Sequence, residues 1–433
     1  MTGPLDGIRV VEFSEIIAGP VSGVLLSDLG ADVIKVEPPW GDPWRGSPTR
    51  VGPPEAKETR GFIAVNRGKR SIRLDLTKSE GVKVVHRLVG GSDVVITNHR
   101  PDVPAKLGID YETLSAIKPD LIYCEITAFG RSGPESAKPG YDIIMQARTG
   151  LMASNGMVDN GVPRGLRGSP PIDFATGYAV AQGVLAGLFH RERTGRGQKI
   201  ETSLLSNALY IQTLPLTYVP SSPSAQSRMI TEDLPAIREA GLPYPDINGL
   251  YQQDARAQAY RPYYRTFQTK DWVIAVGCLS EPLCKKMADA MELDDPRFSP
   301  GYDQQSEEAL ESSRLVVLDA ERKFLERPAS HWIDLLERAG VPVAPLKFVE
   351  EMVFDEQAIA NGLIVEQEHP FAGTVRTAGP VFKMTDSPTA AEVSSPRLGE
   401  HSVEVLAELG YSEPEIEILI ESGAVSGNVD PNA

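Results

Sequence analysis

Residues 8–37 read IRVVEFSEIIAGPVSGVLLSDLGADVIKVE, and this stretch decides the expected fold. The β-branched, apolar runs 8–13 and 31–37 are typical of buried strands, and the segment between them is typical of a helix. Pro20 suits a first helical turn, and Gly30 suits the stop at its carboxyl end. A strand, a helix and a second strand in this order predict a parallel βαβ unit.

The same alternation continues further along the chain. SEGVKVVHRLVG (79–90) is an amphipathic helical segment followed by the strand-like run 93–97, and YETLSAIK (111–118) is followed by the run 121–127. Repeated βαβ units predict an α/β fold with a Rossmann-like parallel sheet and helices on both faces.

Ligands of such folds collect beyond the carboxyl ends of the strands. Those positions are residues 14–19, 98–100 and 128–133. The first strand–helix turn lacks the GxGxxG pattern, which weighs against a dinucleotide oxidoreductase.

Composition limits the class of protein. A chain of 433 residues predicts two to three domains. Its net charge of −16 weighs against nucleic acids and anionic membranes as partners, and no stretch looks long and apolar enough to span a bilayer. The first residues do not resemble a secretory signal, and three scattered cysteines indicate a reducing compartment. We therefore expect a cytoplasmic enzyme.

The chain is expected to have two domains. Residues 1–220 form the first part of a large domain, 228–325 form a smaller α+β domain with a hairpin around 269–271, and 326–433 return to the large domain. The Pro- and Ser-rich segment 218–227 is typical of a linker.

A long helix is expected after Asp173, and it is rich in alanine and glycine. Glycine weakens an isolated helix by up to about 1 kcal/mol relative to alanine. So many small residues therefore predict very close packing, either in the core or against a partner subunit.

The chain lacks HExxH, GxSxG and P-loop patterns, so we expect no metal site, no serine nucleophile and no P-loop kinase. Two carboxylates remain, Asp142 and Asp173, each at an expected helix entrance. They are candidates for acid/base or nucleophilic chemistry. They are equally candidates for helix caps.

Several segments in order resemble the class III CoA-transferase family, which includes formyl-CoA transferase, carnitine CoA-transferase and α-methylacyl-CoA racemases. They are LDGIRVVEFSEIIAGP, LGADVIKVEPPWGDPWR, NRGKRSIRLDL, NHRPDVPAKLGIDYETL, AFGRSGPESAKPGYDIIMQA, DFATGYAVAQGVLAGLFHRERTGRGQKIETSLL, AGVPVAPL and SPRLGEHSVEVLAELGYSEPEI. The resemblance covers nearly the whole chain.

The resemblance implies an enzyme that moves CoA from an acyl-CoA donor to a carboxylic acid, with no metal. It implies a large domain built from both chain ends, and two chains interlocked as a homodimer. Asp173 of the DxxTG motif matches the family's nucleophile, which forms a mixed anhydride and then an aspartyl-CoA thioester. A carboxylate suits this role because both intermediates are activated acyl groups.

Further site residues follow from the same resemblance. The positions that match CoA contacts are Leu74, Asn98, His99, Lys106, Lys138 and Tyr141. Pro38 replaces an arginine that often holds adenine, and Ile17 replaces a glutamine of formyl-CoA transferase. The loss of this glutamine, and of the glycine-rich lid of formyl-CoA transferase, weighs against formyl or oxalyl specificity.

Two alternatives and one substrate hypothesis remain open. A racemase of the same family would use a histidine where this chain has Tyr141, and a non-catalytic acyl-CoA-binding protein would not need Asp173. Arg45, Arg164 or Arg167 could hold the second carboxylate of a dicarboxylic acid such as succinate or malate. A solvated loop arginine is the alternative for each.

Overall fold

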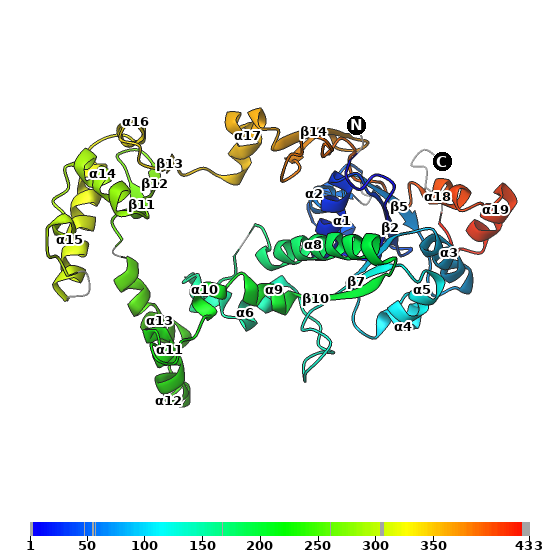
Figure 1. Cartoon of the computed structure of the whole chain (residues 1–433), viewed down its shortest axis with the longest axis horizontal. Helices are drawn as coiled ribbons and strands as arrows, with labels where there is room; N and C mark the ends of the chain where they lie inside the picture. The colour runs from blue at the N-terminus through cyan, green and yellow to red at the C-terminus, as the bar shows by residue number, and fades with distance from the viewer. Residues whose placement is uncertain are drawn as a thin grey trace. The chain divides into compact units, whose positions relative to one another are not determined.

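The structure is a computed structural model, and it describes residues 3–46, 48–53, 56, 58–166, 168–259, 261–303 and 307–426. The chain divides into two compact units. The larger unit comprises Met1–Met157, Pro163–Thr217 and Val353–Ala433, and the smaller comprises Val158–Val162 and Tyr218–Met352. Figure 1 shows their elements along the chain.

The larger unit is built on a six-stranded sheet in the order β10-β7-β6-β1-β2-β5. All neighbouring strands pair in parallel. The strands are β1 (Arg9–Glu12), β2 (Asp32–Glu37), β5 (Lys69–Arg73), β6 (Val94–Thr97), β7 (Ile122–Thr127) and β10 (Gln198–Ser203). The predicted α/β fold with a parallel sheet is confirmed.

One face of this sheet is covered by α1 (Ala18–Asp28) and α8 (Pro171–Thr194). Leu26 of α1 and Val184 of α8 lie in one buried cluster with Val10, Val94 and Ile122 of the strands. The β-branched strand residues thus form the floor on which both helices pack.

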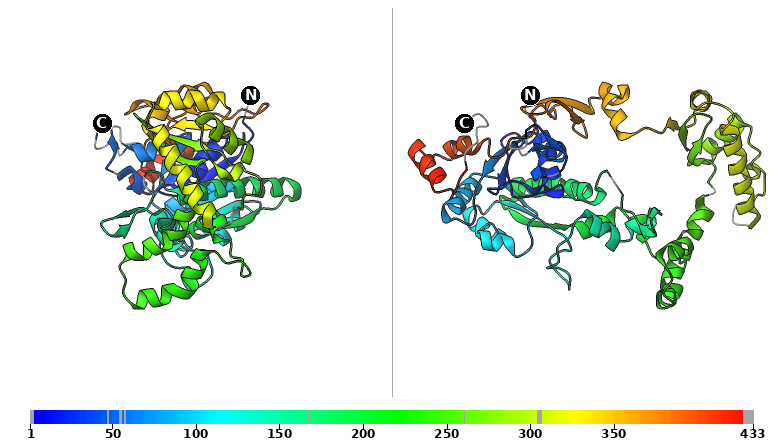
Figure 2. Two further views of the ribbon diagram at one scale, coloured as in Figure 1. Left: turned by 90° about the vertical axis from the view of Figure 1, so that its left-hand side faces the viewer. Right: turned by 180° about the vertical axis from the view of Figure 1, so that it is seen from behind.

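The opposite face is covered by α3 (Ser79–Gly90) and α5 (Tyr111–Ile117), together with α18 (Ser402–Glu408) and α19 (Glu413–Glu421). Leu88, Val405 and Leu419 are buried in the same cluster as Val11 and Ile34. Figures 1 and 2 show the red C-terminal helices beside α3. Both ends of the chain therefore contribute to the larger unit.

Close packing of α8 is confirmed at Gly177. A Cβ there would lie 2.6 Å from Cγ1 of Val21 and 3.0 Å from the carbonyl oxygen of Ala18, and both residues belong to α1. At Gly187 a Cβ would lie 2.9 Å from Ile122 on β7. Only glycine lets the two backbones approach this closely.

Of the described helices, α8 alone has the length and mean hydropathy, 1.3, of a membrane span. The expectation that no stretch is long and apolar enough is therefore wrong for α8. Half of that window is buried within the chain, and core helices of globular proteins pass the same test of length and hydropathy.

The smaller unit contains a three-stranded sheet, β11-β12-β13 (Tyr264–Gln268, Val273–Gly277 and Val343–Pro345). The predicted hairpin is confirmed, with β11 and β12 antiparallel. The helices of this unit are α11 (Ala225–Arg228), α12 (Leu234–Glu239), α13 (Tyr244–Ala259), α14 (Glu281–Met291), α15 (Glu307–Phe324) and α16 (Ala329–Arg338).

The return to the larger unit occurs at residue 353, whereas the sequence predicted it at 326. Trp332 and Leu336 of α16 are buried with Phe324 of α15 in the core of the smaller unit. β13 pairs with β12 and is half-buried or exposed, so it is an edge strand of the smaller unit.

The remaining elements of the larger unit are short. They are η1 (Pro43–Gly46), β3 (Arg50–Val51), β4 (Glu58–Thr59), α2 (Arg60–Ala64), α4 (Val103–Leu107), α6 (Asp142–Arg148), α7 (Leu151–Ser154), α9 (Leu204–Tyr210), α10 (Thr213–Leu216), α17 (Glu356–Ala360), β14 (Ile364–His369) and β15 (Gly373–Ala378). A hairpin of β8 (Val158–Asp159) and β9 (Val162–Pro163) precedes α8.

Candidate active site

A cavity of about 590 Å³ opens at the carboxyl edge of the six-stranded sheet. Its wall consists of residues 15–18 after β1, 98–103 after β6, 126–128 at the end of β7 and 138–141 before α6, with Asp173 and Leu204. All of these residues belong to the larger unit. The cavity lies where ligands of open parallel sheets bind.

Asp173 brings an unpaired carboxylate to this cavity. It is the third residue of α8, whose N-cap is Pro170, and it makes no capping hydrogen bond. The residue is only 9% exposed, and among the described residues no donor bonds to its carboxylate. Burial, and then the negative charge of Asp142, raise the pKa of Asp173 to about 7. The helix-cap interpretation of Asp173 is therefore wrong.

Asp142 caps α8 instead, although it is the first residue of α6. Its Oδ2 accepts hydrogen bonds from the backbone N–H groups of Ile172, at 2.8 Å, and Asp173, at 3.2 Å. Its Oδ1 accepts from Nε2 of Gln146 at 2.5 Å. Asp142 thus satisfies the free donors of the first turn of α8 and holds the backbone of Asp173 in place.

The sequence brought the two aspartates forward as a pair but did not reveal this arrangement. Asp142 precedes Ile172 by 30 positions, so no capping-box spacing links them. The signal that could have found it is Pro170 at the N-cap of α8, which leaves the first turn without a polar cap of its own.

Asn98 and His99 both line the cavity. The amide of Asn98 is used on the backbone of Glu15: its Oδ1 accepts from the Glu15 N–H at 2.9 Å, and its Nδ2 donates to the Glu15 carbonyl at 2.7 Å. Nδ1 of His99 lies 2.9 Å from the hydroxyl of Thr97. Burial, and then the charge of Lys35, lower the pKa of His99 to about 4, so the imidazole is neutral near pH 7.

The other residues expected to contact CoA differ in their placement. Lys138 and Tyr141 line the cavity, and Lys138 forms an ion pair with Glu135 at 2.8 Å. Lys106 lies on α4 and pairs at 2.5 Å with Asp102, which lines the cavity. Leu74 does not contribute a side chain, since it is 1% exposed and packed in the core.

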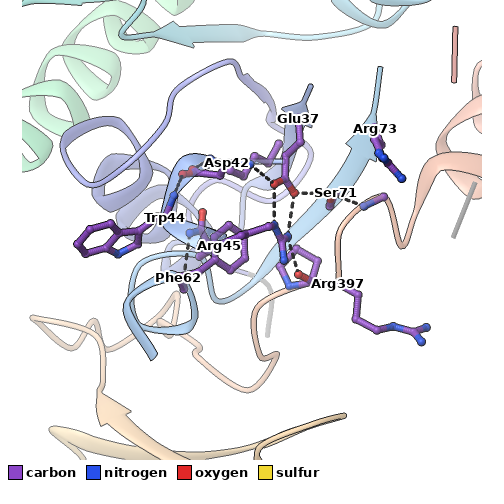
Figure 3. Close-up of polar contacts among 12 residues, drawn as sticks. Glu37, Asp42, Trp44, Arg45, Phe62, Ser71, Arg73 and Arg397 are labelled. Atoms are coloured by element: carbon purple, nitrogen blue, oxygen red, sulfur yellow. Dashed lines mark hydrogen bonds and ion pairs between the residues drawn. The ribbon is translucent and has the colours of Figure 1, made fainter. Parts of the chain in front are cut away.

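Arg45 cannot act as the expected carboxylate clamp, because its guanidinium is already paired. Nε and Nη2 bond to Glu37 at 2.7 and 2.8 Å, and Nη1 bonds to Glu58 at 2.6 Å. Figure 3 shows the side chain between Glu37 and the ring of Phe62, which lies 3.5 Å from its Cζ. Arg45 is 2% exposed, so it is a structural residue.

The other two expected arginines do not strengthen the clamp hypothesis. Arg164 is half-buried, and its backbone N–H bonds to the carbonyl of Met157 at 2.8 Å. Arg167 lies outside the described residues. Arg100 and Lys138 are instead the cationic side chains in the cavity wall.

The described residues include no group of three His, Cys, Asp or Glu side chains arranged to hold a metal ion. What the cavity offers is an unpaired carboxylate, a neutral imidazole, two cations and the start of α1. A parallel sheet with such a cavity at its carboxyl edge defines an α/β enzyme for an anionic substrate.

The chain belongs to CoA-transferase family III, whose model matches residues 5–402. It is 36% identical to succinate–glutarate CoA-transferase of Agrobacterium fabrum, covering 94% of this chain and 96% of the relative. It is 31% identical to succinyl-CoA:glutarate CoA-transferase of Mus musculus, covering 98% and 90%. The solved structure of Rv3272 from Mycobacterium tuberculosis matches with a TM-score of 0.72 at 26% identity, covering 93% and 98%. The protein is thus a CoA-transferase that acts on CoA thioesters.

Proposed function

We propose that Asp173 is the nucleophile that carries CoA from an acyl-CoA donor to a carboxylic acid acceptor. The observation that supports this most is the unpaired, buried carboxylate in the wall of the cavity. A carboxylate that accepts no hydrogen bond is a stronger nucleophile than a paired one. Its raised pKa, about 7, still leaves a large ionised fraction at neutral pH.

The reaction begins when an oxygen of Asp173 attacks the thioester carbonyl. The C–S bond breaks, CoA leaves as the thiolate, and a mixed anhydride remains. The thiolate then attacks the carboxyl carbon of Asp173, which releases the donor acid as a carboxylate and forms an aspartyl-CoA thioester. The acceptor carboxylate then attacks the aspartyl-CoA thioester and releases the thiolate, which leaves a mixed anhydride of Asp173 and the acceptor. The thiolate attacks the acceptor carbonyl of this anhydride, which forms the new acyl-CoA and restores the carboxylate of Asp173.

The residues around Asp173 suit the charges that develop. Ile17 and Ala18, at the start of α1, line the cavity, and the side chain of Ile17 does not cap the helix. A helix N-terminus stabilises negative charge, which fits the oxyanion of each tetrahedral intermediate. Lys106, which pairs with Asp102 of the cavity wall, would supply positive charge for the phosphates of CoA.

We propose a dicarboxylic acid as acceptor and succinyl-CoA as donor, with glutarate, succinate and malate as the acids to test first. Two relatives that match nearly the whole chain are named for succinyl-CoA or succinate and for glutarate. Arg100 and Lys138 replace Arg45 as candidates to hold a second carboxylate, because they line the cavity.

We also propose that two chains form an interlocked homodimer. Large apolar side chains on α8, α9 and α10 are exposed, among them Phe189, Tyr210 and Leu214 at 64%, 80% and 91%. Such side chains are normally covered in an obligate dimer. Light scattering of the purified protein should give twice the mass of the chain, and a monomer would contradict the proposal.

The function is tested by trapping the acyl-enzyme. The protein is incubated with succinyl-, acetyl- and formyl-CoA in turn, quenched with hydroxylamine, and digested for mass spectrometry. A hydroxamate at Asp173 that forms with the true donor supports the proposal. An unmodified Asp173, with exchange of the substrate α-proton into deuterated water, would instead indicate the racemase reaction.

The pH dependence should report the ionisation of Asp173. We expect kcat/KM for acyl-CoA to rise with pH, with its half-maximum near 7, because only the carboxylate attacks. Asp142→Asn keeps an oxygen for the N–H of Ile172 but removes a negative charge beside Asp173. The half-maximum of kcat/KM should then move to lower pH. It should stay above 3.8, the ordinary pKa of an aspartate, because burial is the larger cause of the raised pKa of Asp173.

His99→Gln is the control for this profile. The pKa of His99 is lowered to about 4, so replacing this histidine should not remove the rise of kcat/KM near pH 7. The assignment to Asp173 would be contradicted if the half-maximum of kcat/KM stayed at the same pH in Asp142→Asn. It would also be contradicted if the rise of kcat/KM near pH 7 disappeared in His99→Gln.

A further inference from the structure

The segment Ser14–Ile17, between β1 and α1, has a strained backbone at the cavity. Ile16 has a φ of 69°, in the left-handed region. Glycine adopts this region freely, whereas a β-branched residue is a genuine outlier there. Because Glu15, Ile16 and Ile17 line the cavity, this strain lies in its wall.

Three buried or half-buried side chains hold this segment by its backbone. Asn98 bonds to both the N–H and the carbonyl of Glu15, at 2.9 and 2.7 Å. Nζ of Lys35 donates to the carbonyl of Ser14 at 2.6 Å. Both carboxylate oxygens of Asp42 lie 3.3 Å from the N–H of Ile16. Every residue from Ser14 to Ile16 is thus tethered to a side chain from another part of the chain.

The tethers are themselves fixed. Nζ of Lys35 lies 3.0 Å from Asp42 and 3.1 Å from Glu12, and all three side chains are at most 1% exposed. Asp42 also accepts the N–H of Trp44 at 2.8 Å, a contact drawn in Figure 3. This leaves the carboxylate little freedom to turn away from Ile16.

Buried ion pairs of this kind seldom stabilise a fold more than apolar residues of the same volume would. The pair of Lys35 and Asp42 therefore calls for a reason besides stability. Its contacts with Ser14 and Ile16, next to the first residues of α1, supply one.

We propose that Lys35 and Asp42, together with Asn98, are positioning residues that hold Ile16 in its left-handed conformation and so shape the cavity wall for the reacting thioester. The proposal rests on the function proposed above, in which this wall stabilises the oxyanion. Asp42 does not itself line the cavity, so it acts through the backbone of Ile16.

The test is a rescue experiment on the full-length enzyme. Asp42→Asn keeps the shape of the side chain but loses its charge and its pairing with Lys35. We expect kcat for CoA exchange to fall at least about tenfold, with KM for acyl-CoA nearly unchanged, since the wall acts on the transition state. Adding Ile16→Gly removes the steric cost at φ 69° and should restore most of that loss, up to about tenfold.

Glu58→Gln is the matched control, because Glu58 is a buried partner of Arg45. It should lower the melting temperature without lowering kcat, and Ile16→Gly should not improve it. If Asp42→Asn itself fails to fold, the double variant Lys35→Met/Asp42→Asn removes both charges together and is tested with and without Ile16→Gly.

Two results would overturn the proposal: a folded Asp42→Asn enzyme with unchanged kcat, or a loss that Ile16→Gly does not restore. Failure of the proposed function looks different. If the proposed function is wrong, the unsubstituted protein forms no hydroxamate at Asp173. The rescue experiment instead compares the kcat values of the variants with one another.

Discussion

Asp173→Asn should reduce CoA exchange by at least about 10³-fold, because an amide cannot form the mixed anhydride or the aspartyl-CoA thioester. The expected loss is in kcat, while binding of CoA remains. The measurement is exchange between succinyl-CoA and each candidate acid, with CoA binding followed by calorimetry. Exchange that survives at more than a tenth of the original rate would contradict the nucleophile assignment.

Asp110→Ala is the cap control for this variant, because asparagine caps a helix about as well as aspartate and would hide the effect. Asp110 also lies at a helix entrance, but it is a true cap, and its Oδ1 accepts the N–H of Thr113 at 3.0 Å. Its replacement should destabilise the protein by about 0.5–2 kcal/mol and leave the exchange rate unchanged.

The stability of Asp173→Asn should change in the opposite direction. The pKa of Asp173 is raised from 3.8 to about 7 in the folded protein, so the folded state binds a proton that the unfolded state has lost. Stability from this group is present at low pH and is lost as the pH rises towards 7. Above pH 7 the asparagine variant should therefore be more stable by about 2–4 kcal/mol. A capping aspartate would show no such gain, because asparagine caps a helix about as well as aspartate.

Arg45→Met should give the second large effect, a loss of about 3–5 kcal/mol in the free energy of unfolding. The substitution leaves Glu37 and Glu58 buried without the cation that they share. In the unsubstituted protein, the contact with Arg45 holds the pKa of Glu37 at about 2. The measurement is thermal and denaturant unfolding of the full chain.

Two further variants separate structure from substrate binding at this position. Arg322→Ala removes exposed pairs with Asp319 and Glu326 and should change the free energy of unfolding little, because ion pairs in water contribute little to stability. Arg45→Lys keeps the charge, and the KM for the acceptor acid should not change in the folded variant. A loss in Arg45→Met as small as that in Arg322→Ala would contradict the account, as would a raised KM in Arg45→Lys.

The central βαβ unit could be predicted because its signals are local. The apolar runs within residues 8–37, with Pro20 and Gly30, suffice to predict β1, α1 and β2. The observed bounds of these elements agree with the prediction to within a few residues. The packing of α18 and α19 beside α3 depends on contacts between distant parts of the chain, which no local pattern contains. The boundary at 353 was missed for the same reason, since Trp332 packs against Phe324.

The site was predicted in part. Its aspartates and most of its cavity residues stood out as residue types at the ends of strands and helices. Their partners did not, since an arginine in the sequence shows a charge but not whether two buried glutamates already hold it, as they hold Arg45. The left-handed Ile16 was invisible for a related reason: its conformation comes from its tethers and not from its own preference.

Transfer of ¹⁸O is the most direct test of the central claim, which is that Asp173 exchanges its own oxygen with the substrates. The enzyme is turned over with unlabelled succinyl-CoA and an excess of acceptor labelled with ¹⁸O in its carboxylates, and the peptide that contains Asp173 is then weighed. The proposed sequence of bonds predicts heavy oxygen in Asp173, because thiolate attack on the acceptor carbonyl leaves one acceptor oxygen on the aspartate. Acyl-CoA product formed with no heavy oxygen in Asp173 would contradict the account.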